Sequence, residues 1–482
     1  MSNRAKYETL ALSVLKDLAK ARGIKGITGL KKADVIEAMC KKDEEEAAAS
    51  APAEKSEVTA PAERPAAENR EAQTAAVADA VPEKGDAAAA DKGQAGDLDI
   101  SEEKKNLDSG IEASGILEVL ADGYGFIRSE NYLPGENDVY VAPSQIRRFS
   151  LKTGDIITGN TRIKTQTDKF GALLFVKTIN GLSPAEHSKR KNFEDLTPIF
   201  PDERLRLEVP GGTVAMRIMD LMSPVGKGQR GMIVSPPKAG KTTLLKDVAR
   251  SVKRNNPEMY LIILLIDERP EEVTDIKEAI EGPKVEVIYS TFDELPEHHK
   301  RVSEMVIERA KRLVEAGEDV IILLDSITRL TRAYNMTVPP SGRTLSGGLD
   351  PAALHMPKRF FGAARNMREG GSLTILATAL IETGSKMDDV VYEEFKGTGN
   401  MEMVLDRKLS EKRVFPAIDI PKSGTRREDL LLDQEELEAI NVIRKAFNGL
   451  KPEEAVEKVL DMFVRTRSNR EFVQMVKKIR FI

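Results

Sequence analysis

A phosphate-binding loop is predicted at residues 235–242, Ser-Pro-Pro-Lys-Ala-Gly-Lys-Thr. An apolar run precedes it and a helical pattern follows, which is the order of strand, turn and helix that such a loop requires. Backbone N–H groups of the turn and of the helix N-terminus point at one spot and favour an anion there. Lys241 can reach the β- and γ-phosphates of ATP, and the Thr242 hydroxyl can ligate Mg²⁺.

The loop departs from the usual pattern at its first position, where Ser235 replaces glycine and two prolines follow. A chance Gly-Lys-Thr in a surface turn is the alternative interpretation. The strand predicted before the loop and the helix predicted after it argue against chance, so we expect a nucleotide site here.

Apolar runs alternate with helical patterns on both sides of this loop. After the run at 231–234 they lie at 260–266, 285–288, 320–324 and 373–377. Near-continuous apolar strands alternating with helices indicate a parallel sheet covered on both faces. We therefore expect an α/β P-loop ATPase core of the RecA-like kind, with ligands at the carboxyl ends of the strands.

Two carboxylates stand at these strand ends. Asp325 closes the run at 320–324 and can hold Mg²⁺ through its water shell, although aspartate is also favoured as an ordinary helix N-cap. Glu268 follows the run at 260–266 and can orient and deprotonate the attacking water. Asp267 and Glu271 are nearby competitors for that role.

A second module is predicted between residues 113 and 182, where five short β-like runs are separated by glycine and Asp/Asn. This spacing suggests a small barrel of the oligonucleotide-binding or cold-shock type. Tyr124, Phe126 and Arg128 alternate along one run, so all three side chains share one face. Such a face can stack bases and neutralise phosphate, whereas the alternative is that both rings belong to the barrel core.

The bulk composition sets limits on the class of protein. The chain has 482 residues and a net charge of −5, so contacts with nucleic acid must come from a local patch. A single cysteine, Cys40, fits a reducing cytosol. No apolar run approaches the roughly 18 residues that a membrane span needs, and the N-terminus does not read as a signal peptide. We expect a cytoplasmic protein.

These patterns divide the chain into five parts. We predict a helical unit, a disordered acidic and Ala/Pro-rich insertion, the barrel, an extended linker, and the ATPase core with C-terminal helices at 433–447, 452–467 and 469–478; the five parts span 1–42, 43–108, 109–182, 183–212 and 213–482.

Several cations outside these motifs have two interpretations. The glycine-rich loop 339–348 carries Arg343, and the loop 382–387 carries Lys386; both can contact a polyanion, or both are flexible surface turns. Arg413 and Arg426 lie far from the phosphate loop in sequence. An arginine supplied across a subunit boundary would explain them, and the alternative is that they are surface residues.

Taken together, these segments closely resemble the Rho family of bacterial transcription termination factors. The resemblance is loose over 1–42 and close over 113–482, and the segments that carry it are 123–126, 143–149, 236–242, 265–273, 320–330, 358–365 and 393–400. It implies a homohexameric, RNA-dependent ATPase and helicase that moves 5′→3′ on pyrimidine-rich nascent RNA. RNA polymerase and elongation factors are the implied partners.

The resemblance also implies roles for individual residues. Phe415 would stack on adenine, and Arg413 and Arg426 would act on the γ-phosphate held by a neighbouring subunit. The remaining ATP-site residues would be Pro237, Lys238, Ala239, Gly240, Lys241, Thr242, Thr243, Glu268, Arg269 and Asp325. The RNA-binding residues would be Tyr124, Phe126, Arg128, Asp138, Tyr140, Asp168 and Phe170 at a primary site, and Arg343, Ser346 and Lys386 at a secondary site inside the ring.

Three of these positions differ from the family pattern. Phe170 stands where tyrosine is common, Asp168 where glutamate is common, and Arg343 where lysine is usual. Stacking is kept at Phe170 but a phenol hydrogen bond is lost, and the planar fork of an arginine replaces a point charge at Arg343.

Two other classes of protein remain alternatives. A rotary or secretion-type ring ATPase shares the core but has no base-stacking barrel. A non-catalytic RNA-binding protein would use the nucleotide only as a structural ligand, and the presence of both Glu268 and Asp325 argues against it.

Overall fold

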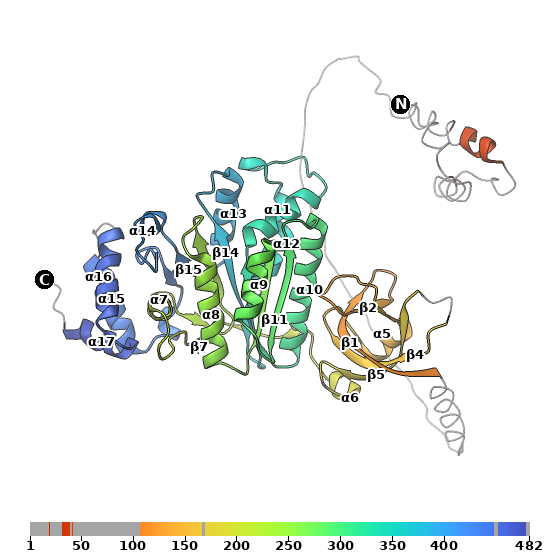
Figure 1. The fold of residues 1–482 in the computed structure, drawn as a ribbon, viewed down its shortest axis with the longest axis horizontal. Helices are drawn as coiled ribbons and strands as arrows, with labels where there is room; N and C mark the ends of the chain where they lie inside the picture. The colour runs from red at the N-terminus through yellow and green to blue at the C-terminus, as the bar shows by residue number, and fades with distance from the viewer. Residues whose placement is uncertain are drawn as a thin grey trace, which may run out of the picture. The chain divides into compact units, whose positions relative to one another are not determined.

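The computed structural model describes residues 107–165, 169–447 and 452–478, together with 19, 31–38 and 41. The chain divides into two compact units, Met1–Ala89 and Ala90–Ile482. In the first unit, residues 32–38 are helical. The rest of the predicted helical unit, and the predicted insertion up to residue 106, lie outside the described residues. The second unit holds the barrel and the ATPase core, shown in Figure 1.

The predicted barrel is present as a closed five-stranded barrel in the order β1-β2-β3-β5-β4. Its elements are β1 (Asp108–Val119), β2 (Gly125–Arg128), β3 (Val139–Val141), α5 (Pro143–Phe149), β4 (Ile156–Arg162) and β5 (Gly171–Ile179). Alternate residues of the strands point inward, and the interior is filled by Leu117, Ile127 and Ile157, each at most 2% exposed. Phe126 and Arg128 therefore face outward from β2, as the strand pattern predicts.

The segment from 183 to 212 connects the barrel to the core. It contains α6 (Pro184–His187), η1 (Phe193–Asp195), β6 (Pro198–Ile199) and β7 (Arg204–Leu205). We expect an extended linker from its prolines, and the structure adds two short strands that pair with the core. β6 pairs with β13 (Arg365–Met367), and β7 pairs with β8 (Val225–Gly226).

The core sheet has the order β11-β10-β12-β14-β9-β15-β16. Its strands are β9 (Arg230–Ser235), β10 (Tyr260–Glu268), β11 (Val285–Thr291), β12 (Asp319–Asp325), β14 (Ser372–Leu380), β15 (Met401–Val404) and β16 (Gly424–Thr425). Strands β11, β10, β12, β14, β9 and β15 run parallel to one another. The predicted parallel sheet is confirmed, and the loops that follow β9, β10 and β12 meet at one edge.

Helices cover both faces of the sheet because the strands are apolar on both sides. Ile263 and Leu323 face α7 (Val214–Met222), α8 (Lys241–Asn255) and α9 (Pro270–Ala279). Ile262 and Leu324 face the opposite group of helices. That group comprises α10 (Pro296–Glu315), α11 (Ile327–Thr337), α12 (Pro351–Gly362) and α13 (Lys386–Lys396). Figure 1 shows the two groups on either side of the strands.

The C-terminal segment is helical, as its periodicity predicts. After α14 (Arg407–Glu411) and η3 (Glu428–Leu430) come α15 (Gln434–Phe447), α16 (Pro452–Val464) and α17 (Asn469–Lys478). Phe463 and Phe472 stack with ring centroids 3.9 Å apart and join the hydrophobic core on the α8 face. Within the described residues, no helix is long and apolar enough to cross a membrane.

Candidate nucleotide and RNA sites

The predicted phosphate-binding loop, residues 235–242, spans the end of β9, the turn after it and the start of α8. Helix α8 begins at Lys241, and Gly240 caps it with φ of 92°, a left-handed conformation that favours glycine. Ala239 is buried, whereas Pro237, Lys238 and Thr243 are exposed. The loop therefore presents the first backbone N–H groups of α8 to an anion.

Lys241 joins the two predicted carboxylates in one cluster. Its ammonium Nζ lies 2.9 Å from Glu268 Oε1 and 2.6 Å from Asp325 Oδ1. Both carboxylates are at most 3% exposed, and Thr378 Oγ1 donates to Asp325 at 2.7 Å. The neighbouring strands β10 and β12 position them, because Leu265 is the partner of Asp325 in their parallel register. The structure thus brings together residues that are 84 positions apart.

Burial and charge shape the titration of this cluster. Burial raises the pKa of Glu268, and the neighbouring Asp325 raises it further, while Lys241 opposes both effects. Burial acts to lower the pKa of Lys241, but Asp325 and Glu268 reverse this and raise it. Glu268 is therefore a carboxylate whose basicity is increased by its site, which suits a general base.

The two competitors for the base role lie in different surroundings. Asp267 has φ of 56° at an irregularity in the β10–β11 pairing, and its carboxylate turns toward Arg329 Nη1 at 3.6 Å. Glu271 is exposed in the first turn of α9. Arg269, the N-cap of α9, is also exposed. Glu268 is the one of the three carboxylates that contacts Lys241.

The residues predicted to hold Mg²⁺ are oxygen donors of the kind that this hard cation prefers. Thr242 lies next to Lys241 at the start of α8, and its hydroxyl donates to Glu272 Oε2 at 3.3 Å. Asp325 Oδ1 accepts a hydrogen bond from Lys241 Nζ at 2.6 Å. The described residues contain no cluster of three or more His, Cys, Asp or Glu that would hold a metal.

A cavity of about 730 Å³ lies beside the phosphate-binding loop and is lined by Lys238, Ala239, Gly240 and Phe415. A Cβ placed on Gly240 would be 4.0 Å from Phe415 Cε1, so the ring lies directly beside the loop. The cavity has the size and the mixed lining of a site for a purine base.

Sequence reasoning missed several residues of this cavity. Thr213, Asp247 and Leu405 also line it, and Thr213 Oγ1 donates to Asp247 Oδ2 at 3.0 Å. No spacing signal marks them, because they come from three elements that are distant in the sequence.

The structure places the two predicted trans-acting arginines in different surroundings. Arg413 follows α14, and its backbone nitrogen donates to the carbonyl oxygen of Ser410 at 3.0 Å. Ser410, in α14, in turn donates from Oγ to the carbonyl oxygen of Lys238 at 2.8 Å. Arg426 instead lines a cavity of about 640 Å³ with Arg230 and Arg365. Arg413 is therefore near the chain's own phosphate-binding loop, and Arg426 lies at the opposite ends of strands β9 and β15, beside Arg230.

Arg230 and Arg365 are further residues that sequence reasoning missed. Their guanidinium groups donate to backbone carbonyl oxygens, and among the described residues neither they nor Arg426 form an ion pair with a carboxylate. Burial lowers the pKa of Arg230, and the charges of Arg365 and Arg426 lower it further. A cavity lined by mutually repelling cations is suited to an anionic ligand.

The predicted RNA-binding residues of the barrel form one aromatic surface. The Phe126 ring lies 5.9 Å from Tyr124, 6.0 Å from Tyr140 and 5.2 Å from Phe170, measured between centroids. All four rings are partly exposed. The alternative that Tyr124 and Phe126 belong to the barrel core is therefore wrong, since the inward face is filled by other side chains. Asp168 lies outside the described residues.

Arg128 is held more tightly than an exposed phosphate-binding residue. It is 6% exposed, its guanidinium lies 4.8 Å from the Phe126 ring centroid, and it forms ion pairs with Asp138 and with Glu118. Arg128, Asp138, Phe126 and Phe170 nevertheless line one cavity of about 690 Å³ that also receives Lys169.

The loop at 339–348 lies against the loop at 382–387 and the start of α13. A Cβ placed on Gly347 would be 2.4 Å from the backbone nitrogen of Met387, so only glycine allows the first loop to approach the start of α13 this closely. Ser346 and Lys386 are therefore near one another, and both are exposed, as is Arg343. Their proximity was predicted only through the resemblance.

Comparisons with known proteins agree with the division into a barrel and an ATPase core. The family described as "Rho termination factor, RNA-binding domain" matches residues 113–185. The family described as "ATP synthase alpha/beta family, nucleotide-binding domain" matches residues 215–425.

Two bacterial relatives named transcription termination factor Rho align over most of the chain. The protein of Pseudomonas aeruginosa is 56% identical over 382 residues, which are 78% of this chain and 90% of the relative. That of Bacillus subtilis is 56% identical over 365 residues, 76% of this chain and 84% of the relative.

A solved ATPase from a type III secretion system of pathogenic bacteria has the same core fold. It has 20% sequence identity and a TM-score of 0.50, over 66% of this chain and 94% of the other. At this identity the likeness concerns the fold alone.

Proposed function

The chain belongs to the Rho family of transcription termination factors, and from its site geometry we propose how it acts: as a homohexamer that couples ATP hydrolysis to movement along nascent RNA. It is an RNA-dependent ATPase with an RNA-binding barrel and a nucleotide-binding core. The observation that carries the proposal is the presence, in one chain, of the outward aromatic surface around Phe126 and the Lys241–Glu268–Asp325 cluster.

At the ATP site, basic, aromatic and acidic residues have different proposed roles. Lys241 and the N–H groups of the loop bind the phosphates, and Phe415 stacks on the base. Glu268 accepts a proton from the attacking water. Mg²⁺, held by Thr242 and by Asp325 through water, would supply positive charge that offsets the phosphates. The roles of Glu268 and Asp325 are supported by their shared contact with Lys241.

The proposed ring completes this site with a residue from a second copy. Arg426 shares a cavity with Arg230 and Arg365 but has no carboxylate partner among the described residues. A γ-phosphate held by a neighbouring subunit supplies the missing negative charge and gains transition-state stabilisation from Arg426. Arg413, which lies beside its own loop, is proposed to act at the same subunit boundary.

RNA occupies two sites in this proposal. The barrel binds pyrimidine-rich RNA by stacking bases on its aromatic surface. The joined loops of Arg343, Ser346 and Lys386 contact the phosphates inside the ring and transmit hydrolysis as 5′→3′ movement. The partners are RNA polymerase and elongation factors, in the cytoplasm, where nascent transcripts are made.

The decisive experiment is ATP hydrolysis by the purified protein with poly(C), with poly(dC) and without polymer. Strong stimulation by the RNA alone is the expected result, because the 2′-hydroxyl distinguishes RNA from DNA. Equal rates in all three conditions would contradict the proposal and favour a ring ATPase that works on another substrate.

A further inference from the structure

An ion-pair chain runs from the RNA-binding surface of the barrel to helix α10 of the core. On the barrel, Arg128 Nε donates to Glu118 Oε2 at 2.7 Å. From α10, Arg301 Nη2 donates to the same oxygen at 2.6 Å. Glu118 Oε2 therefore accepts hydrogen bonds from two guanidinium groups that belong to different domains.

The barrel end of the ion-pair chain is part of the proposed RNA-binding surface. Glu118 is the register partner of Phe126 across β1 and β2, and Phe126 is the partner of Tyr140 across β2 and β3. Opposite residues in antiparallel strands share a face. Arg128 lines the cavity with Phe126 and with its other partner Asp138, so a nucleotide bound in that cavity would lie beside the guanidinium that pairs with Glu118.

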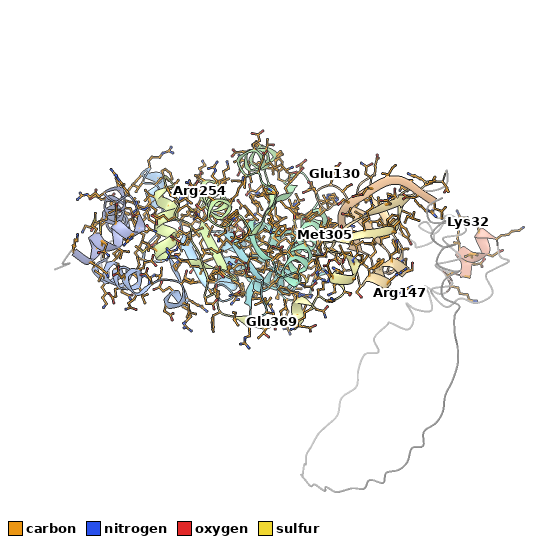
Figure 2. The ribbon with its side chains drawn as sticks, turned by 90° about the horizontal axis from the view of Figure 1, so that it is seen from below. Lys32, Glu130, Arg147, Arg254, Met305 and Glu369 are labelled. Carbon is orange, nitrogen blue, oxygen red and sulfur yellow. The ribbon has the colours of Figure 1, made fainter. Side chains whose placement is uncertain are left out.

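The core end of the ion-pair chain is Arg301, which lies on α10, a helix that is firmly anchored in the core. Met305, one turn after Arg301, is 2% exposed and lies among densely packed side chains in Figure 2. Glu304 Oε1 accepts a hydrogen bond from Tyr334 of α11 at 2.9 Å. A force on Arg301 therefore acts on α10 and on α11 together rather than on one flexible side chain.

Both helices lead to the proposed general base. Just before α10, the backbone nitrogen of Phe292 donates to the carbonyl oxygen of Glu268 at 3.1 Å. Helix α11 begins directly after Asp325 and Ser326, and its Arg329 Nη2 lies 3.8 Å from Glu268 Oε1. The ion-pair chain is thus connected through packed elements to Glu268.

From this arrangement we propose that Arg301 is a positioning residue that couples RNA occupancy of the barrel to ATP hydrolysis. A phosphate or base carbonyl that binds Arg128 weakens its hold on Glu118. Glu118 then pairs more fully with Arg301 and draws α10 toward the barrel. Among the described residues, Glu118 is the carboxylate paired with Arg301, so Arg301 has no competing carboxylate. The inference rests on the proposed RNA-dependent ATPase function.

The barrel and the core also touch at sites that do not involve the RNA-binding surface. Asn131 Nδ2 donates to the carbonyl oxygen of Tyr289 at 2.6 Å, and its Oδ1 accepts from the Tyr289 nitrogen at 3.0 Å. Asn131 does not line the cavity beside Phe126. Asn131→Ala therefore removes a barrel–core contact without altering the ion-pair chain, and it is the matched control.

The test compares the full-length wild-type protein, Arg301→Gln and Asn131→Ala. We expect Arg301→Gln to keep the basal ATPase rate, and to lose about fivefold or more of the stimulation of kcat by poly(C). We expect its affinity for labelled oligo(C), measured by anisotropy without nucleotide, to change by less than about threefold, because Arg301 does not touch the RNA. Asn131→Ala should keep its stimulation.

Two further variants separate coupling from simple structural support. Arg301→Lys retains the positive charge and should restore part of the stimulation. In a double-mutant cycle, adding Glu118→Gln to Arg301→Gln should cause little further loss of coupling, since both changes break one link.

The outcomes separate the two proposals. If the wild type is stimulated by poly(C) and Arg301→Gln is stimulated equally, or if Asn131→Ala loses as much stimulation as Arg301→Gln, the role of Arg301 is refuted while the proposed function stands. If poly(C) does not stimulate the wild type, the proposed function fails, and this inference fails with it.

Discussion

Glu268 and Asp267 are adjacent in the sequence, yet the irregularity in β10 separates their environments. Glu268 is 3% exposed and contacts Lys241, whereas Asp267 turns to Arg329. Replacing Glu268 by glutamine keeps the shape of the side chain but removes the basic oxygen. We expect kcat to fall by about 10²–10⁴-fold, while ATP and RNA still bind. Single-turnover hydrolysis and nucleotide-binding assays measure the two effects.

Asp267→Asn is the matched control for this variant. It changes a neighbouring carboxylate of the same β10 segment, which does not contact Lys241, so its kcat should remain within about threefold of wild type. Normal hydrolysis by Glu268→Gln would assign the base role to another carboxylate, with Asp267 and Glu271 as the first to test.

The pH dependence of hydrolysis follows from the raised pKa of Glu268. Burial and Asp325 favour its protonated form, and a protonated carboxyl cannot accept a proton from water. Activity should therefore be lost as the pH falls through a pKa above the ordinary value of 4.5 for glutamate. The acidic limb of kcat/KM, which reports the free enzyme, measures it. A limb at or below 4.5 would contradict this assignment.

At the scale of elements, the junction between the barrel, α6 and α10 contains a buried histidine. His187 is 2% exposed, and its Nε2 has no hydrogen-bond partner among the described residues. Burial, and then the charge of Arg190, lower its pKa to about 4, with Lys152 and Arg312 acting in the same direction and Asp155 opposing them.

This shift has a predictable effect on stability. Below about pH 6.5 the unfolded chain takes up a proton at His187, but the folded chain does not until about pH 4. Stability should therefore fall as the pH drops through this window, by at most about 3–4 kcal/mol from this group. His187→Gln should flatten that part of the profile, as measured by urea unfolding at several pH values. An unchanged slope in His187→Gln would show that the histidine is not held neutral by its surroundings.

Most of the elements could be predicted from the sequence because their patterns are local. The apolar run at 260–266 becomes β10, and the helical periodicity after residue 469 becomes α17. Strands β6 and β7 were not predicted, because each has two residues and is held by pairing with a distant partner. A two-residue strand leaves no periodicity to detect.

The candidate sites were predictable to the extent that they carry motifs. Lys241 and Thr242 follow from the loop pattern, and Asp325 follows from its place at a strand end. Arg230, Arg365 and Arg301 carry no such signal, because their neighbours come from distant parts of the sequence and meet them only in the folded chain. The sequence showed that Phe126 and Arg128 share a face but not that Arg128 is paired with Glu118.

At the scale of the whole molecule, the proposed ring makes a distinction between two adjacent arginines. Arg426 has no carboxylate partner among the described residues, whereas Arg427 pairs with Asp429. Arg426→Ala should lower kcat by about 10³-fold or more while nucleotide binding persists. Arg427→Ala, which lines the same cavity, should lower it far less.

The oligomeric state must be measured alongside these rates. Light scattering should give the same hexameric mass for both variants, so that lost activity reflects a missing charge rather than a broken ring. A monomeric wild type that hydrolyses ATP with full RNA stimulation would refute the trans role of Arg426.

The Lys241–Glu268–Asp325 cluster also affects which anions bind favourably beside the loop at residues 235–242. A bare polyanion that draws Lys241 away leaves two buried carboxylates without a counter-charge, and that cost opposes its binding. A polyanion that binds together with a cation draws the Lys241 ammonium away, but its cation takes the place of the ammonium beside the two carboxylates. Binding of such a complex exchanges one cation for another beside the two carboxylates, so we expect it to be favoured over the binding of free phosphate.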